Sequence, residues 1–230
     1  MKLKNRFYND YLKSLVLTQG STEPRSTESK QMQELIYMNN HIQRFYNGNY
    51  FSYAVFETLG GFRYKVTTDA RIYKIKDGTL KEVKAHIMAN MSTTYKALRY
   101  MYQGEQHNIH MHLVMMVCAY PDFLDAYLSN NLFRVNHCMI AEDDNDRSDL
   151  YDMLSNLEIC THSTNLRHGR FCHKYGIYNT HIESEDLDEL LPLMIPLSDD
   201  MNDALRERVK RMNRAAVNNF YMERGLALWV

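Results

Sequence analysis

The sequence has few turn-forming residues and no excess of either charge. Four prolines and nine glycines in 230 residues favour long regular elements and argue against a loop-rich scaffold. The 27 basic and 28 acidic side chains give a formal charge of −1, so contact with nucleic acid requires a local basic patch. This length fits one large domain, or one domain with a terminal appendage.

Cysteines are also few, and long apolar runs are missing. The four cysteines are widely spaced, which favours reduced thiols in a cytoplasmic protein. Residues 1–6 are polar and lack the apolar core of a secretory signal. The longest apolar run, residues 113–120, is far shorter than the roughly 20 residues that a membrane helix needs. The sequence therefore predicts a cytoplasmic protein with no membrane segment.

Apolar spacing predicts an α+β fold, with a central, mainly antiparallel sheet, helices packed on it, and N- and C-terminal helices. Helical spacing or capping residues predict helices over 1–17, 31–46, 81–103, 121–130, 143–157, 185–195 and from 198–200 onward. Period-two alternation or apolar runs predict strands over 50–59, 62–75, 107–119 and 133–141, with Phe62, Tyr64 and Val66 on one face of the second. Turn and helix-end signals mark the boundaries: Gly60-Gly61 predicts a hairpin turn, Lys76-Asp77-Gly78 a turn, Gly104 the end of the helix over 81–103, and Pro121-Asp122 the start of the next helix.

These elements suggest three segments. Residues 1–48 form an N-terminal helical segment with a polar linker, residues 49–183 form an α+β core, and residues 184–230 form a C-terminal helical segment. The core is predicted in the order strand, strand, helix, strand, helix, strand, helix. Residues 160–181 show no clear period and are predicted to be irregular.

His110 and His112 are the most informative pair in the chain. In a strand, side chains two residues apart point to the same face, so both imidazoles would lie close enough to share a metal ion. The apolar residues that follow would anchor the strand in the core. The alternative is a pair of histidines that bond only to backbone or water.

This pair, together with the predicted element order, resembles the HUH endonuclease superfamily of rolling-circle replication initiators and relaxases. The resemblance covers about residues 50–160. It implies a metal-dependent DNA nickase in which His110 and His112 bind a divalent cation, magnesium or manganese. It also implies a tyrosine nucleophile on a later helix that leaves a 5′-phosphotyrosine link and a free 3′-OH.

The resemblance assigns the nucleophile to Tyr151, with Tyr127 as second choice. Ser155 stands where replication proteins of the family usually carry a lysine, four residues after the tyrosine. A third metal ligand is expected from elsewhere on the sheet. Asp69 is the first candidate, and His137 and Glu142 remain open.

Two further regions could bind ligands. Residues 160–173 contain Cys160, His162, His168, Cys172 and His173, a donor set that could hold zinc but whose spacing matches no common zinc finger. The alternative is a basic loop with two buried cysteines.

Cations gather in the same segment and in the final helix. Arg167, Arg170 and Lys174 are interleaved with aromatic residues, and Arg206, Lys210 and Arg214 recur every four residues. Both sets are candidate phosphate contacts, and the alternative is that they are ordinary solvent-exposed side chains.

Residues 225–230 are strongly apolar and could assemble with another chain or a second copy. The sequence thus favours a nickase that acts on nucleic acid. The alternative is a non-catalytic protein of a virus or mobile element that assembles through this apolar C-terminus.

Overall fold

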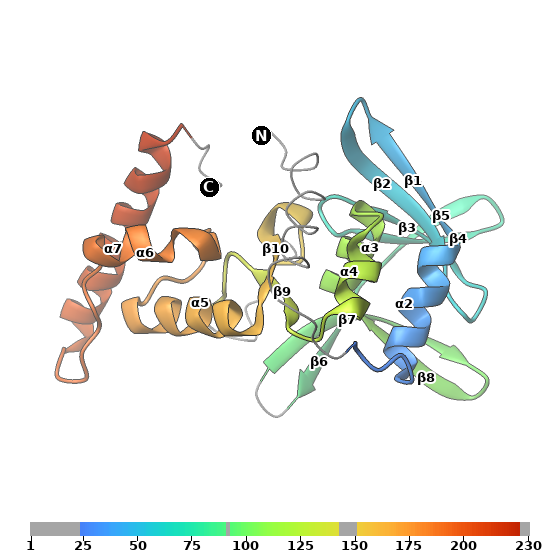
Figure 1. Ribbon diagram of the computed structural model, residues 1–230, viewed down its shortest axis with the longest axis horizontal. Helices are drawn as coiled ribbons and strands as arrows, with labels where there is room; N and C mark the ends of the chain where they lie inside the picture. The colour runs from blue at the N-terminus through green and yellow to red at the C-terminus, as the bar shows by residue number, and fades with distance from the viewer. Residues whose placement is uncertain (1–23, 91–92, 143–150, 226–230) are drawn as a thin grey trace. The chain divides into compact units, whose positions relative to one another are not determined.

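The computed structural model describes residues 24–90, 93–142 and 151–225, and its fold divides into two units (Figure 1). The β unit comprises residues 2–133 and 148–157, and the helical unit comprises residues 134–147 and 158–230. Antiparallel sheets with packed helices confirm the predicted α+β class. The helices of the described ranges are all too short or too polar to cross a bilayer.

An antiparallel meander of five strands forms the larger sheet of the β unit. In order, its strands are β1 (Ile42–Asn47), β2 (Tyr50–Glu57), β3 (Arg63–Thr67), β4 (Ile72–Lys76) and β5 (Thr79–Val83). The inner face is apolar and buried, and it comprises Ala54, Phe56, Tyr64, Val66 and Ile72. The alternation predicted for Tyr64 and Val66 is therefore confirmed.

Turns divide this sheet where the sequence carries turn residues. Gly61, with a φ of 71°, lies in the predicted turn between β2 and β3 and donates its N–H to the Thr58 carbonyl at 2.8 Å. The single strand predicted over 62–75 is wrong, because the chain turns at Thr67–Arg71. There the Ala70 N–H donates to the Thr67 carbonyl at 2.9 Å.

The second sheet replaces a predicted helix. Residues 81–103 were expected to be helical, but they contain the end of β5, then β6 (His86–Asn90) and β7 (Thr93–Tyr102). β7 pairs with β8 (Glu105–His110) through a tight turn at Gln103 and Gly104, whose φ angles of 51° and 80° suit a two-residue hairpin. A glycine with positive φ serves such a turn as well as a helix C-terminus, so Gly104 did not distinguish the two.

Helix α3 (Met111–Ala119) replaces most of the strand predicted over 107–119. Only residues 107–110 are extended, at the end of β8. All nine side chains of α3 are buried, and the helix contacts β1 and β2 on one sheet and β7 and β8 on the other (Figure 1). The short, unbroken apolar run over residues 113–119 fits a fully buried helix as well as a strand, and this ambiguity explains the error.

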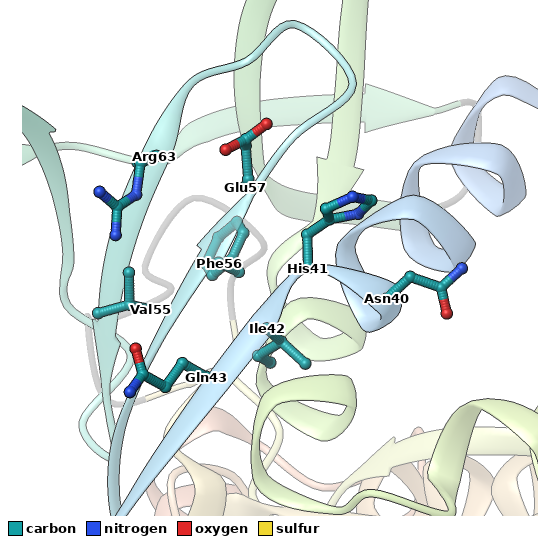
Figure 2. Close-up of a pocket in the computed structure, with 8 residues that line it drawn as sticks. All are labelled: Asn40, His41, Ile42, Gln43, Val55, Phe56, Glu57 and Arg63. Atoms are coloured by element: carbon teal, nitrogen blue, oxygen red, sulfur yellow. The ribbon is translucent and has the colours of Figure 1, made fainter.

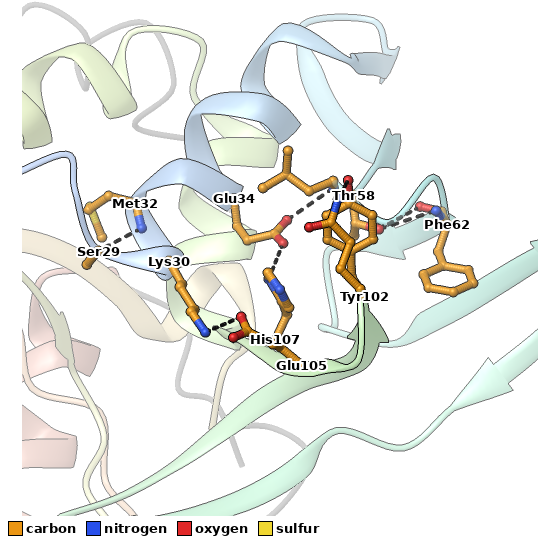
Figure 3. Close-up of polar contacts among 11 residues, drawn as sticks. Ser29, Lys30, Met32, Glu34, Thr58, Phe62, Tyr102, Glu105 and His107 are labelled. Atoms are coloured by element: carbon orange, nitrogen blue, oxygen red, sulfur yellow. Dashed lines mark hydrogen bonds and ion pairs between the residues drawn. The ribbon is translucent and has the colours of Figure 1, made fainter.

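Helix α2 (Lys30–Asn40) is hydrogen-bonded to β8 through its side chains (Figure 3). The predicted helix over 31–46 is too long, since its last residues belong to β1. His107 donates from Nδ1 to the Glu34 carboxylate at 2.8 Å, and the Leu59 N–H donates to the other Glu34 oxygen at 3.2 Å. The Gln31 side-chain oxygen accepts from the His110 backbone N–H at 3.2 Å, so α2 also fixes the end of β8.

Arg44 of β1 caps the C-terminal end of α3. Its Nε donates to the Cys118 carbonyl at 3.0 Å, and its Nη2 donates to the Val117 carbonyl at 2.9 Å. A cation at this end also complements the partial negative charge of the helix terminus. Helix α4 (Phe123–Ser129) follows, close to its predicted position.

The helical unit contains the strand pair β9 (Phe133–His137) and β10 (Leu157–Thr161), each starting one residue before the unit, with α5 (His162–Tyr175), α6 (Leu187–Leu190) and α7 (Asp203–Glu223). Short 3₁₀ turns are η1 (Leu154–Asn156, in the β unit), η2 (Ser184–Asp186) and η3 (Leu191–Leu193). Its core is formed by Phe171, Cys172, Tyr175, Ile177, Ile182, Leu187, Leu190, Met194, Val217, Phe220 and Tyr221.

Several sequence predictions for this part of the chain need correction. The irregular segment predicted over 160–181 contains α5, which Thr161 caps by accepting from the Thr164 N–H at 3.2 Å and which ends at Gly176, with a φ of 61°. The helix predicted over 143–157 is wrong for residues 151–157, which form a turn, η1 and the start of β10. Residues 143–150, and the helix predicted over 1–17, lie outside the described residues.

The order of elements also differs from the predicted one. Eight strands, β1 to β8, follow α2 before α3 begins. The long final helix is confirmed, although Asn202 caps it rather than residues 198–200, by accepting from the Leu205 N–H at 2.9 Å. The short helical stretch predicted over 185–195 is confirmed by α6 and η3.

Replacing Arg44 tests the cap on α3. We expect Arg44→Met to lower the free energy of unfolding by about 2 kcal/mol, because two carbonyls lose a charged donor while the aliphatic stem keeps its packing. Urea denaturation measures this change. Arg71→Ala is the control, since Arg71 is exposed and contacts the partly exposed Asp69 and Tyr73, and it should cost less than about 0.5 kcal/mol. Equal losses in both variants would contradict the cap.

Replacing either partner of the buried Glu34–His107 pair tests the tie between α2 and β8. Glu34 is 1% exposed, and burial raises its pKa above the ordinary value of 4.5. A carboxyl group whose pKa is raised in the folded state stabilises the fold at pH values below its ordinary pKa. This contribution to the free energy of unfolding is lost as the pH rises through the raised pKa. Glu34→Gln should therefore flatten the decline of stability above pH 4.5.

His107→Ala should instead cost about 3–5 kcal/mol at neutral pH, because it leaves the Glu34 carboxylate buried without its partner. The double variant Glu34→Gln/His107→Ala should recover part of this loss. Unfolding curves recorded across the pH range compare all three variants. A pH dependence of Glu34→Gln identical to that of the unaltered chain would contradict this interpretation.

Candidate metal centre

The two predicted histidines lie at the junction of β8 and α3. β8 ends at His110, which is also the residue preceding the first turn of α3, and His112 lies within that turn. The ring centroids are 5.4 Å apart, with planes inclined by 35°. The two rings therefore come together as predicted, although a strand-to-helix junction and not a continuous strand positions them.

Tyr95 of β7 adjoins both imidazoles. Its ring stacks on His110 with centroids 5.0 Å apart and lies 5.3 Å from the centroid of His112. Antiparallel pairing of Ala97 with His110 brings this part of β7 beside the junction. Sequence reasoning missed Tyr95 because it placed residues 81–103 in a helix. The β-branched pair before it, Thr93 and Thr94, is the signal that favoured a strand.

Asp152 supplies a carboxylate to the same place. It is 3% exposed, and one of its oxygens and a ring nitrogen of His112 lie within 4.8 Å of each other. Hydrogen bonds hold the surrounding segment. Leu154 donates its N–H to the Thr68 carbonyl at 3.0 Å, and Asn156 donates from Nδ2 to the Tyr151 carbonyl at 2.8 Å.

The electrostatics keep His110 neutral. Burial lowers the pKa of His110 below its ordinary value of 6.5, and the nearby Asp152 carboxylate offsets this shift only in part. The imidazole of His110 therefore keeps a free lone pair at neutral pH. A neutral ring of this kind can ligate a metal or accept a proton.

The donors at this centre suit a divalent cation. His112 offers nitrogen and Asp152 offers carboxylate oxygen, both are buried, and their spacing allows one ion to lie between them. A mixed nitrogen and oxygen set matches Mn²⁺ better than Mg²⁺, which prefers oxygen ligands alone. Two protein ligands leave coordination positions for water and a substrate phosphate.

Two of the other predicted ligands, Asp69 and Glu142, make ion pairs elsewhere in the chain. Asp69 lies in the turn between β3 and β4, where its carboxylate accepts from the Thr67 hydroxyl and pairs with Arg71 at 3.2 Å. Glu142 pairs with Lys210 in the helical unit. His137 is buried at the end of β9, also in the helical unit. The structure thus gives the β-unit centre the carboxylate of Asp152, which the sequence did not single out.

The two tyrosines predicted as nucleophiles are both buried. Tyr151 is buried in a turn and does not lie on a helix, so the placement on which its selection rested is wrong. Tyr127 of α4 stacks on Phe123, with centroids 5.2 Å apart, and the guanidinium of Arg25 lies 3.8 Å from its ring centroid. The only sequence signal for Asp152 was its position directly after the candidate Tyr151.

Within the segment from Cys160 to His173, Cys172 Sγ and His168 Nε2 lie 3.7 Å apart, but no group of three donors gathers as a zinc site would require. Burial raises the pKa of Cys160 and of Cys172 to about 12, so both remain protonated thiols at neutral pH. His168 is fully buried and bonds through Nε2 to the Ile182 carbonyl at 3.1 Å. His162 and His173 are exposed on α5.

The predicted phosphate-binding cations divide into engaged and exposed side chains. Arg167 pairs with Asp188, and Arg206 donates to the Ser198 carbonyl at 3.1 Å. Lys210 is 9% exposed and bonded to Glu142 and Glu207, so it cannot belong to a solvent-facing basic stripe.

Arg170 and Lys174 are exposed on α5, and Arg214 is half-buried on α7. Their role in nucleic-acid binding stays a prediction. The apolar tail, except Gly225, lies outside the described residues.

Comparison with protein-family models, with curated proteins and with solved structures gives no match for this chain. The resemblance to the HUH superfamily therefore stays a prediction.

Calorimetric titration with Mn²⁺ tests the centre. We expect His112→Ala and Asp152→Asn each to weaken binding at least about tenfold, because each removes one ligand. Asp69→Asn is the matched control, since that carboxylate is held by Thr67 and Arg71, and it should bind as the unaltered chain does. Loss of binding in Asp69→Asn but not in Asp152→Asn would reverse the assignment.

Proposed function

We propose that this protein is a metal-dependent DNA nickase whose divalent cation is bound by His112 and Asp152. The observation that supports this proposal most directly is the approach of these two buried donors to within 4.8 Å, beside the His110 and Tyr95 rings. Buried ionisable groups are costly unless they serve a structural or chemical role, so such a cluster favours a reactive site.

A bound Mn²⁺ or Mg²⁺ would polarise the scissile phosphate and lower the charge that develops on its oxygens. The chain itself supplies the nucleophile and the base. In the proposed step the phenol oxygen of Tyr95 forms a bond to phosphorus and the bond from phosphorus to the 3′ oxygen breaks. The phenol proton passes to the neutral His110 ring and from there to the departing 3′ oxygen.

This assignment keeps the chemistry implied by the HUH resemblance but moves the nucleophile. Tyr95 adjoins both imidazoles, whereas Tyr151 is the sequence-based candidate. We further propose that the protein acts in the cytoplasm, in keeping with four buried cysteines that form no disulfide. Assembly through residues 225–230 remains a proposal that light scattering of a chain lacking them would test.

Nicking of supercoiled plasmid with Mn²⁺ tests the function. Relative to the unaltered chain, His112→Ala and Asp152→Asn should lose about 100-fold or more in rate, and Tyr95→Phe about 1000-fold or more. Tyr151→Phe and Asp69→Asn should keep their activity as matched controls. Denaturing gels should reveal a covalent adduct between the protein and the 5′ side of the nick.

Two outcomes would contradict the proposal. Absence of nicking by the unaltered chain with any divalent cation would favour the non-catalytic alternative. Nicking without an adduct, retained in Tyr95→Phe, would assign the attack to water and remove tyrosine from the mechanism.

A further inference from the structure

The outer face of the five-stranded sheet is aromatic and carries charges of both signs. The inner face is buried core, whereas the outer face carries Gln43, Phe45, Tyr53, Val55, Lys65 and Tyr73 on neighbouring strands. None of these six side chains is fully buried. A face of this composition is available for a ligand that offers both flat rings and negative charge.

Three side chains form an ordered row across this face. Phe45 of β1 stacks on Tyr53 of β2, with centroids 4.4 Å apart and planes inclined by 13°. The Nζ of Lys65 on β3 lies 4.2 Å from the centroid of Tyr53. The row ends at Phe45 on the edge strand β1, whose one neighbour in the sheet is β2, so within the described ranges no further strand of this sheet covers the far side of that ring.

A pocket lies farther back along β1. It has a volume of about 340 Å³ and is lined in part by Gln43, Val55, Glu57 and Arg63 of the outer face, with Asn40 and His41 from the end of α2 (Figure 2). Gln43 and Phe45 point to the same face two residues apart, about 7 Å along the strand. The pocket and the aromatic row therefore follow each other on a single strand.

Tyr37 of α2 orients the polar groups of the pocket. Its hydroxyl donates to the Glu57 carboxylate at 3.0 Å, and its ring stacks on His41 with centroids 4.0 Å apart. A fixed carboxylate, a guanidinium and side-chain amides can together read the hydrogen-bonding edge of a nucleobase. A base held in a duplex has that edge engaged in its base pair and cannot present it to the pocket.

Two cations lie close to the aromatic row. Arg63 and Lys65 are on the outer face of β3, the strand next to Tyr53, and Glu57 of β2 and Glu82 of β5 balance their charge over the whole face. Positive charge is therefore available to a phosphate beside the row, where Lys65 adjoins Tyr53.

We propose that this outer face binds single-stranded nucleic acid, with one base stacked on Phe45, a neighbouring base in the pocket, and phosphates near Lys65 and Arg63. Stacking on an aromatic ring within a basic groove is a common way to hold a single strand. The inference rests on the proposed action on nucleic acid, and it gives that action a substrate form and a binding surface.

Fluorescence anisotropy with a labelled oligothymidylate of about 16 nucleotides tests the proposal. The measurements are made in EDTA, which removes divalent cations, so that neither cleavage nor metal binding contributes to the signal. We expect Phe45→Ala to weaken binding about tenfold or more, whereas Phe45→Tyr keeps the ring and should keep the affinity. Lys65→Ala should reduce the slope of log affinity against log salt concentration by about one. Lys30→Ala, on α2 and paired with Glu105, should leave it unchanged.

Circular dichroism and thermal unfolding of each variant separate loss of binding from loss of fold. Equal affinity of Phe45→Ala and the unaltered chain would overturn the inference. Tighter binding of the matched duplex than of the single strand would also overturn it.

His112→Ala separates this inference from the proposed function. It should bind the oligonucleotide normally while losing nicking. If the protein does not nick DNA but its binding requires Phe45, only the nickase proposal is contradicted. If it nicks DNA but its binding does not require Phe45, only the proposed binding surface is contradicted.

Discussion

The β unit depends on the complete burial of α3. Nine consecutive residues without a charged side chain lie against both sheets, so every face of the helix is covered by another element. Such a helix cannot satisfy its ends with water, and the surrounding chain supplies partners. Arg44 bonds the last carbonyls, while the start of the helix lies at the His110–His112 junction beside Tyr95 and Asp152.

Helix α2 holds this arrangement from the outside. Its contacts with β8 pair a buried carboxylate with His107 and bond the backbone of His110 directly. A buried pair of this kind gains little stability in total, but loss of one member is costly, so it favours a single register. The candidate metal centre is consequently built on regular elements whose positions are fixed by buried polar contacts, as a site with demanding geometry requires.

The sequence predicted those parts of the fold in which local chemistry is unambiguous. Gly60-Gly61 and Lys76-Asp77-Gly78 indicated turns, Pro121-Asp122 indicated α4, and the long amphipathic period indicated α7. It failed where one pattern fits two structures. The run from Met111 to Ala119 suits a strand or a buried helix, and residues 81–103 satisfied helical spacing although cross-strand pairing decides their structure.

The candidate site shows the same division. His110 and His112 were identified from spacing alone, and they come together for a different geometric reason from the one assumed. Asp152 and Tyr95 reach them only through tertiary contacts, Asp152 from a turn shortly before η1 and Tyr95 from a strand that the sequence presented as a helix. Sequence period carries no information on such long-range neighbours.

Anomalous diffraction from crystals grown with Mn²⁺ tests the central claim most directly. The account predicts a strong anomalous peak within about 2.3 Å of both a His112 ring nitrogen and an Asp152 carboxylate oxygen. A peak at another site with none at this one, at a Mn²⁺ concentration that saturates the protein in solution, would contradict it.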